Sequence, residues 1–276
     1  MTASEQPIQA AASIHPIDGL LRADRLPHIL CPGCGIGTVI HGYAHAIAGS
    51  GIEQDKHVCV SGIGCSGRAA GYVNVDSYHA THGRALPFAL GIAVHNPELN
   101  VTVISGDGDL TAIGGNHLIH SARRNVNLNV ICINNFTYGM TGGQVGPTTP
   151  VGAKGTTAPY GAVEHPFNLP YLAKATGAVF VARWTILHVR EFQDAVLRSM
   201  KKQGFCFIEV LAPCPTSFGR TNKIGDGLHE VEIYRERCRI HNGARNLEDL
   251  DIDLIDKNKP ITVGNFVDIE RKPFTV

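Results

Sequence analysis

Two short polar motifs in this sequence have the residue types needed to bind a magnesium diphosphate. Gly106-Asp-Gly-Asp109 and Asn134-Asn135 each follow a short apolar run. The glycines allow backbone amides to approach a diphosphate, and the N-terminus of a following helix adds a favourable dipole. Asp107 and the Asn135 amide offer the hard oxygen ligands that Mg²⁺ prefers. Each motif alone is also a common turn or strand terminator, so the prediction depends on their pairing.

A second set of candidate ligands consists of four cysteines. Cys31 and Cys34 form a C-x-x-C motif on a Pro-Gly loop, a spacing that lets two thiolates face one metal. Cys65 lies in a glycine-rich turn, and Cys214 lies between two prolines. Four thiolates suit either structural zinc or a [4Fe–4S] cluster, although zinc sites usually have two tight pairs and this chain has one.

The remaining four cysteines have less chemical promise. Cys59, Cys132 and Cys206 lie inside apolar runs, where free cysteine is usually a small buried residue. Cys238 lies among charged residues without an evident partner. The chain shows no export signal, so we expect reduced thiols rather than disulfides and a cytoplasmic location.

The elements that must position these residues alternate along the chain. Apolar runs typical of buried parallel strands occupy residues 58–61, 101–105, 128–133 and 205–211. Helical patterns cover residues 112–124 and 188–202, and Asn168-Leu-Pro170 resembles a capped helix start. This alternation predicts a doubly wound α/β fold with a mainly parallel sheet, which binds ligands at the carboxyl ends of its strands. Residues 139–161 are expected to form a long functional loop.

Composition excludes several other roles. The chain has 276 residues, 24 basic and 24 acidic, so it has no electrostatic basis for binding nucleic acid or an anionic membrane. No apolar run approaches the roughly 18 residues that a transmembrane helix needs. The 43% hydrophobic content is sufficient for a substantial core.

Seven motifs occur in an order that resembles one enzyme family. They are Cys31-Pro-Gly-Cys-Gly, Gly62-Ile-Gly-Cys-Ser66, Thr81-His-Gly-Arg-Ala-Leu-Pro87, Gly106-Asp-Gly-Asp109, Gly115-Asn-His117, Asn134-Asn-Phe-Thr-Tyr-Gly-Met-Thr-Gly-Gly-Gln144 and Ala212-Pro-Cys-Pro215. Together they resemble the β subunit of the 2-oxoacid:ferredoxin oxidoreductases, most closely the 2-oxoglutarate type. The resemblance covers about residues 28–235. It implies a thiamine diphosphate and [4Fe–4S] domain over residues 28–240, between an N-terminal arm over 1–27 and a C-terminal arm over 241–276.

The resemblance also implies a ligand set. Cys31, Cys34, Cys65 and Cys214 would hold the cluster. Asp107 and Asn135 would ligate Mg²⁺ by side chain, and Thr137 by its backbone carbonyl. The residues expected to line thiamine diphosphate are Ile63, Gly64, Cys65, Ser66, His82, Gly106, Gly108, Asp109, Asn135, Gly139, Met140 and Thr141.

The reaction implied is the reversible, coenzyme A-dependent oxidative decarboxylation of a 2-oxoacid, with ferredoxin as the electron acceptor. We expect His82 to be the polar side chain nearest the reacting centre, because imidazole changes protonation near neutral pH. Gly142 and Gly143 lie in a loop where some relatives carry a lysine, and the glycine version resembles that of members selective for 2-oxoglutarate. Arg220 and Lys223 are cationic candidates for binding the second carboxylate of 2-oxoglutarate, or they only flank the cluster loop.

Thiamine enzymes also need a glutamate that is held by a second α/β module, and this chain has no room for one. We therefore expect an α subunit that completes the site in an αβ or α₂β₂ complex. Pyruvate or branched-chain 2-oxoacids are alternative substrates. Two readings from other classes remain open at this point: a non-redox thiamine diphosphate decarboxylase or carboligase, and a zinc-stapled binding module.

Overall fold

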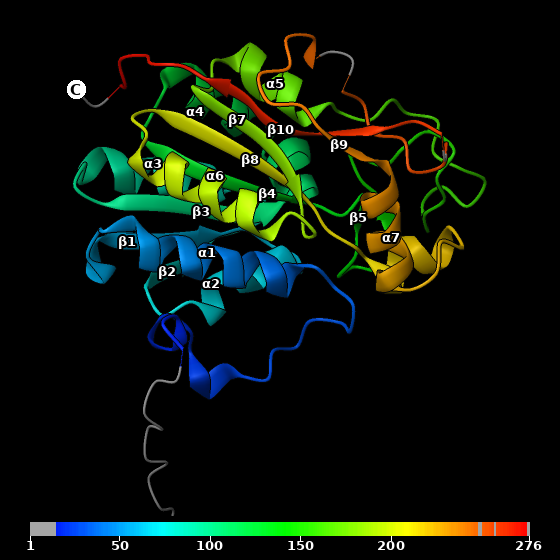
Figure 1. The fold of residues 1–276 in the computed structure, drawn as a ribbon, viewed down its shortest axis with the longest axis horizontal. Coiled ribbons are helices and arrows are strands. Elements are labelled where there is room, and N and C mark those ends of the chain that lie inside the picture. The colour runs from blue at the N-terminus through cyan, green and yellow to red at the C-terminus, as the bar shows by residue number, and fades with distance from the viewer. Residues whose placement is uncertain (1–14, 248–249, 257, 275–276) are drawn as a thin grey trace, which may run out of the picture.

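The computed structural model describes residues 15–247, 250–256 and 258–274. A sheet with the strand order β2-β1-β3-β4-β8-β7-β10-β9 runs through its centre (Figure 1). Every neighbouring pair is parallel except β10 with β7. The strands are β1 (His57–Ser61), β2 (Asp76–His79), β3 (Asn100–Gly106), β4 (Leu128–Asn134), β7 (Phe180–Thr185), β8 (Phe205–Leu211), β9 (Cys238–Ile240) and β10 (Ile261–Asp268). The predicted doubly wound, mainly parallel α/β fold is confirmed.

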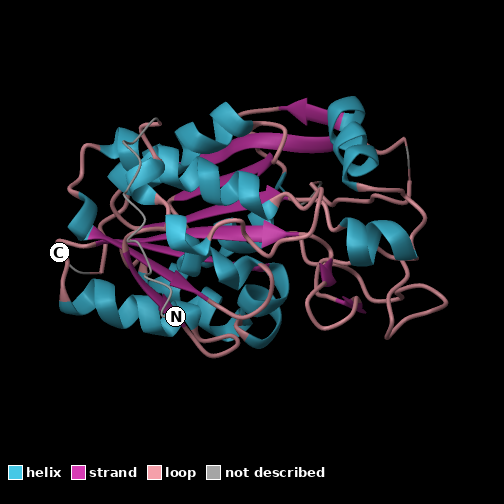
Figure 2. Ribbon diagram, turned by 90° about the horizontal axis from the view of Figure 1, so that it is seen from below, coloured by secondary structure: helices cyan, strands magenta, loops and turns pink. Residues whose placement is uncertain are grey.

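Helices cover both faces of the sheet (Figure 2). Their bounds are α1 (Ile36–Ser50), α2 (Ala69–Tyr72), α3 (Ala85–His95), α4 (Gly115–Arg124), α5 (Leu169–Thr176), α6 (Val189–Lys201) and α7 (Gly227–Arg237). Successive strand residues point to opposite faces. Cys59 therefore joins the core under α1 and α6, whereas Val58 and Val60 join the core under α3, α4 and α5. Burial on both faces explains why the strands read as continuous apolar runs.

The predicted elements agree with the structure to within a few residues, with one informative exception. The helix predicted over residues 112–124 begins at Gly115, and Gly108–Ile113 instead forms a π-helical turn. Such turns are frequent at functional sites. Asn168 caps α5 as predicted, with its side-chain oxygen accepting from the Tyr171 amide at 3.2 Å. The sequence analysis did not identify strands β2, β7 and β9, the short strands β5 (Thr137–Tyr138) and β6 (Gln144–Val145), or helices α1, α2 and α7.

Both ends of the described chain pack against the domain. In the N-terminal segment, Ile17 and Leu20 are buried in the core beneath α1. Leu21 forms a β-bridge with Val73, just after α2. Within the expected C-terminal arm over 241–276, residues Ile261–Asp268 form β10 of the sheet. Residues 1–14 of the predicted arm lie outside the described residues. Within the described ranges, no helix is both long and apolar enough to cross a bilayer.

Candidate active site

One cavity at the carboxyl ends of β1, β3 and β4 brings the predicted cofactor residues together. Its volume is about 170 Å³. All twelve residues expected to line thiamine diphosphate line it, as do Asp107 and Thr137. Ile133 and Tyr138, which the sequence motifs did not single out, also contribute to the wall. The structure thus gathers residues from across the chain into one site, and their roles as ligands remain predictions.

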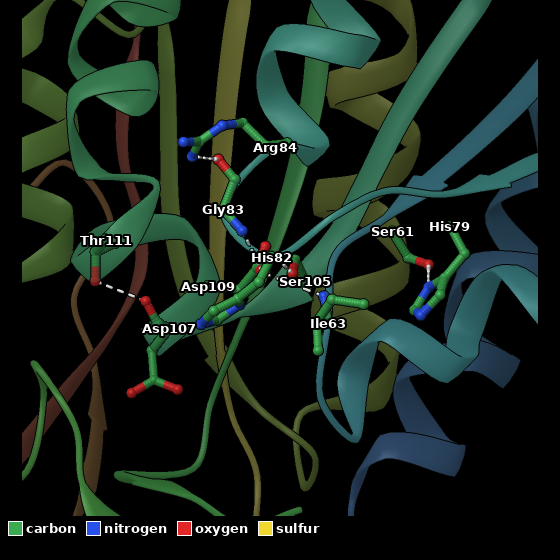
Figure 3. Close-up of polar contacts among 10 residues, drawn as sticks. All are labelled: Ser61, Ile63, His79, His82, Gly83, Arg84, Ser105, Asp107, Asp109 and Thr111. Atoms are coloured by element: carbon green, nitrogen blue, oxygen red, sulfur yellow. Dashed lines mark hydrogen bonds and ion pairs between the residues drawn. The ribbon is translucent and has the colours of Figure 1, made fainter.

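Asp109 organises the loops around this cavity (Figure 3). Its Oδ1 accepts from the backbone amides of Ile63 at 3.1 Å and Gly83 at 2.8 Å, and from Nδ1 of His82 at 2.6 Å. Its Oδ2 accepts from the Ser105 hydroxyl at 2.8 Å. The residue is 2% exposed. A buried carboxylate with four protein donors is fully engaged, so Asp109 shapes the site through its neighbours.

The bond to Asp109 determines how His82 is presented. A carboxylate can only accept, so Nδ1 of His82 carries the proton in this contact. Nε2 is then left for the cavity, which His82 lines. The His82 side chain is 38% exposed, in contrast to its buried partner. The neighbouring His79 instead bonds to the Ser61 hydroxyl at 3.1 Å.

The two asparagines of the Asn-Asn motif have different environments. The Asn134 amide donates to Oε1 of Glu209 at 2.7 Å, and its oxygen accepts from the Phe136 amide at 3.1 Å. Asn135 lines the cavity, and its side chain makes no hydrogen bond within the described part of the chain. Asn134 therefore belongs to the scaffold, and Asn135 is the member of the pair available to a ligand.

Asp107 has the properties of a cation ligand. Its side chain is buried, and desolvation raises its pKa to about 7 despite a hydrogen bond from the Thr148 hydroxyl. Burial disfavours an ionised carboxylate unless a positive charge is close. Together with the amide oxygen of Asn135 and the carbonyl of Thr137, Asp107 forms a hard donor set that fits Mg²⁺.

Gly108 allows close packing in the wall of the cavity. A Cβ atom placed on Gly108 would lie 2.2 Å from Cε1 of Tyr138. Only glycine therefore allows the ring of Tyr138 and the start of the π-helical turn to coexist there. Gly108 and Asp109, which begin that turn, line the cavity.

The four predicted cluster cysteines line a second cavity, of about 250 Å³. A Cβ atom on Gly139 would lie 3.2 Å from Sγ of Cys214 and 3.8 Å from Sγ of Cys65, so these two sulfurs flank the same glycine. Cys31 and Cys34 complete the wall from the loop before α1. Gly33 of that loop has φ +78°, which only glycine adopts readily.

Electrostatics agree with this proximity of the four thiols. Burial, together with Coulombic interactions with Cys214, Cys65 and Cys31, raises the pKa of Cys34 to about 11. Burial also raises the pKa of Cys65 and Cys214. In the described ranges no group of three or more His, Cys, Asp or Glu side chains has the geometry to hold a single metal ion. Four cysteines that line one cavity are the type of ligand that a [4Fe–4S] cluster takes.

The other candidates lie elsewhere. Cys59, Cys132 and Cys206 are buried in strands as expected, and Cys238 is half-buried in β9. Arg220 and Lys223 line a separate cavity beside the cysteine loops and do not line the cavity at Asp107.

Comparison with known proteins agrees with this geometry. Residues 62–210 match the family described as thiamine pyrophosphate enzyme, C-terminal TPP binding domain. Fold and site therefore define a thiamine diphosphate-binding module, which occupies more than half of the chain.

Two relatives and one solved structure show which thiamine diphosphate enzymes this chain is similar to. The chain is 47% identical over 261 residues to the 2-oxoglutarate synthase subunit KorB of Methanocaldococcus jannaschii, covering 95% of both chains. It is 53% identical over 221 residues to that of Archaeoglobus fulgidus, covering 80% of this chain and 82% of the relative. A solved 2-oxoglutarate:ferredoxin oxidoreductase from Magnetococcus marinus, with 2-oxoglutarate, coenzyme A and succinyl-CoA bound, aligns with a TM-score of 0.82 at 30% identity, covering 94% of this chain and 87% of that one. The chain belongs to the 2-oxoglutarate-type 2-oxoacid:ferredoxin oxidoreductase β subunits.

Proposed function

We propose that this chain is the β subunit of an enzyme that converts 2-oxoglutarate and coenzyme A to succinyl-CoA and CO₂, reversibly, with a [4Fe–4S] cluster passing electrons to ferredoxin. The observation that carries the proposal is that the cofactor cavity and the cysteine cavity share part of their walls. Cys65, Asn135, Gly139 and Met140 line both the cofactor cavity and the cysteine cavity. A non-redox thiamine enzyme has no use for four thiols beside its cofactor, and a zinc-stapled module has no use for the Asp107 cavity.

In this proposal, the ends of β3 and β4 hold the magnesium diphosphate. Asp107 and Asn135 supply side-chain oxygens to Mg²⁺, and Thr137 supplies its carbonyl. The glycine-rich turns around Gly64, Gly108 and Gly139 supply close backbone approach. When bound, thiamine diphosphate supplies a carbanion that adds to the keto carbon and an electron sink for decarboxylation.

His82 acts beside the reacting centre. Because Asp109 holds Nδ1, Nε2 can hydrogen-bond the substrate carboxylate or the cofactor at a fixed position. A preorganised donor or acceptor of this kind contributes to orientation and to stabilisation of developing charge. Met140 and Ile63, both partly exposed, provide an apolar rim that limits water access when a partner covers the cavity.

The partner is an α subunit in an αβ or α₂β₂ complex. It supplies the glutamate that thiamine chemistry requires and, with this chain, forms the sites for coenzyme A and the 2-oxoacid. Four thiolates, from Cys31, Cys34, Cys65 and Cys214, hold the cluster. An oxygen-sensitive cluster of this kind agrees with a cytoplasmic location.

The test is turnover by the α and β chains expressed together and purified without oxygen. We expect the complex to be brown, to contain about four iron atoms per β chain, and to reduce ferredoxin with 2-oxoglutarate and coenzyme A. Steady-state rates with 2-oxoglutarate, pyruvate and 2-oxoisovalerate define the substrate. Faster turnover of pyruvate would contradict the 2-oxoglutarate assignment, and colourless protein with bound thiamine diphosphate would favour a non-redox enzyme.

A further inference from the structure

A continuous line of buried polar side chains leads through the sheet to Asp107. Nε of Arg183 on β7 donates to Oε2 of Glu209 on β8 at 2.6 Å, and Oε1 of Glu209 accepts from Asn134 on β4 at 2.7 Å. The Thr148 hydroxyl then contacts both Asn134 Oδ1, at 2.9 Å, and Asp107 Oδ2. Each of these five side chains is at most 3% exposed. The line therefore runs from β7 across β8 and β4 to the residue that follows β3, and all of its members are buried.

The chemistry of each group sets the direction of the bonds. Glu209 only accepts, so Asn134 must turn its amide nitrogen toward Glu209 and its oxygen toward Thr148. That oxygen already accepts from the Phe136 amide. The hydroxyl of Thr148 has a single proton, and of its two acceptors Asp107 Oδ2 lies closer than Asn134 Oδ1. One carboxylate oxygen of Asp107 is thereby committed to Thr148, which fixes the rotation of the carboxylate.

The segment that carries Thr148 is itself tied down. The hydroxyl of Thr149 donates to the Phe136 carbonyl at 2.6 Å and accepts from the Gly146 amide at 2.8 Å. Residues Gln144–Val145 form β6, which pairs with β5 (Thr137–Tyr138). Thr148 is therefore presented to Asp107 from a rigid position, although the two residues are 41 apart in sequence.

We infer that Thr148 is a positioning residue for the magnesium ion of the cofactor, acting through Asp107. The inference rests on the proposed thiamine function. Groups that orient a ligand from behind the coordination shell typically change metal affinity about 10–100-fold when removed. Thr148 needs its hydroxyl for this role, whereas its methyl group contributes only packing.

The experiment compares three variants of the αβ complex. Thr148→Val keeps the shape and removes the hydroxyl, and Thr148→Ser keeps the hydroxyl. Thr185→Val is the matched control, because it removes a buried threonine hydroxyl that bonds to His188 and does not line the cavity at Asp107. Mg²⁺ is titrated calorimetrically at saturating thiamine diphosphate after chelation, and thermal denaturation without cofactor measures stability separately.

We expect Thr148→Val to weaken Mg²⁺ binding about tenfold or more, while Thr148→Ser and Thr185→Val stay within about threefold of the unmodified complex. If Thr148→Val does not fold, Thr148→Ala removes the same hydroxyl and introduces no larger side chain. Unchanged Mg²⁺ affinity in Thr148→Val, or equal losses in Thr148→Val and Thr185→Val, would overturn the inference. Failure of the unmodified complex to bind thiamine diphosphate with Mg²⁺ would instead overturn the proposed function.

Discussion

Oδ1 of Asp109 accepts a hydrogen bond from Nδ1 of His82 at 2.6 Å, although 27 residues separate the two. The same oxygen accepts from two backbone amides, so one buried carboxylate connects the turn after β1, the turn before α3 and the end of β3. The orientation of His82 therefore depends on the buried Asp109 carboxylate, which backbone amides of the protein already hold in place.

Replacing Asp109 with asparagine should damage both folding and catalysis. In Asp109→Asn, the amide nitrogen can donate to the Ser105 hydroxyl, but the uncharged oxygen accepts more weakly from Ile63, His82 and Gly83, at a cost of about 3 kcal/mol in the free energy of unfolding. Thermal denaturation of the β chain in its complex measures this loss. Asp194→Asn is the control, because Asp194 is exposed and pairs with Arg198 on the surface; a loss of similar size there would contradict the argument.

His82→Ala should reduce turnover while leaving the fold intact. The side chain is partly exposed, so its removal opens little space. A positioned imidazole contributes about 10²-fold or more when it takes part in proton transfer or charge stabilisation. We expect kcat to fall by about that factor with thiamine diphosphate affinity within about threefold. An unchanged kcat in this variant would show that His82 takes no part in the reaction.

Serine substitution at any of Cys31, Cys34, Cys65 or Cys214 should remove most of the iron. Cys238→Ser is the control, since this half-buried cysteine lies in β9 and not in the wall of the cysteine cavity. We expect the control to retain about four iron atoms per chain and the absorbance near 400 nm. Loss of iron from Cys238→Ser, or retention of iron in Cys65→Ser, would contradict the proposed set of cluster ligands.

Stability should fall with acidification, partly because of His57. Its side chain is fully buried, and desolvation lowers its pKa below the ordinary value of 6.5. The unfolded chain therefore takes up a proton before the folded chain does, and stability decreases as pH falls below about 6.5, by at most about 1.4 kcal/mol per pH unit. His57→Gln keeps a polar partner for Ser50 and should show a shallower decrease in denaturation midpoint between pH 7 and 5. An identical slope would contradict this assignment.

Gly108→Ala should weaken cofactor binding. The new methyl group would displace the ring of Tyr138 into the cavity, at a cost of about 1–3 kcal/mol, or roughly tenfold or more in affinity. Gly115→Ala is the matched control on the same segment, because a Cβ there meets nothing within 4 Å. Equal thiamine diphosphate affinity in the two variants would show that close approach at Gly108 is dispensable.

Local sequence was sufficient for most of the central strands, the strand ends and the candidate ligands. Strands buried on both faces are continuously apolar, and the glycines and acidic groups that follow them are visible without long-range information. The family resemblance then implied that Ile63 to Ser66, Gly108, Asp109 and Gly139 to Thr141 line one site, and all of them line one cavity.

Tertiary structure alone decided which polar groups serve the scaffold and which face the cavity. Asn134 and Asn135 are identical in type and adjacent, yet a strand turns successive side chains in opposite directions, so one bonds to Glu209 and the other reaches the cavity. Asp109 was predicted as a cofactor contact and does line the cavity, but no local pattern indicated that its carboxylate oxygens also connect two turns to the end of β3. The role of Thr148 has no local signature, because it depends on a loop that returns to β3 from 41 residues away. The donors that bond to a carboxylate come from segments that the fold brings back to it from far along the chain. Periodicity along the sequence does not encode these long-range contacts.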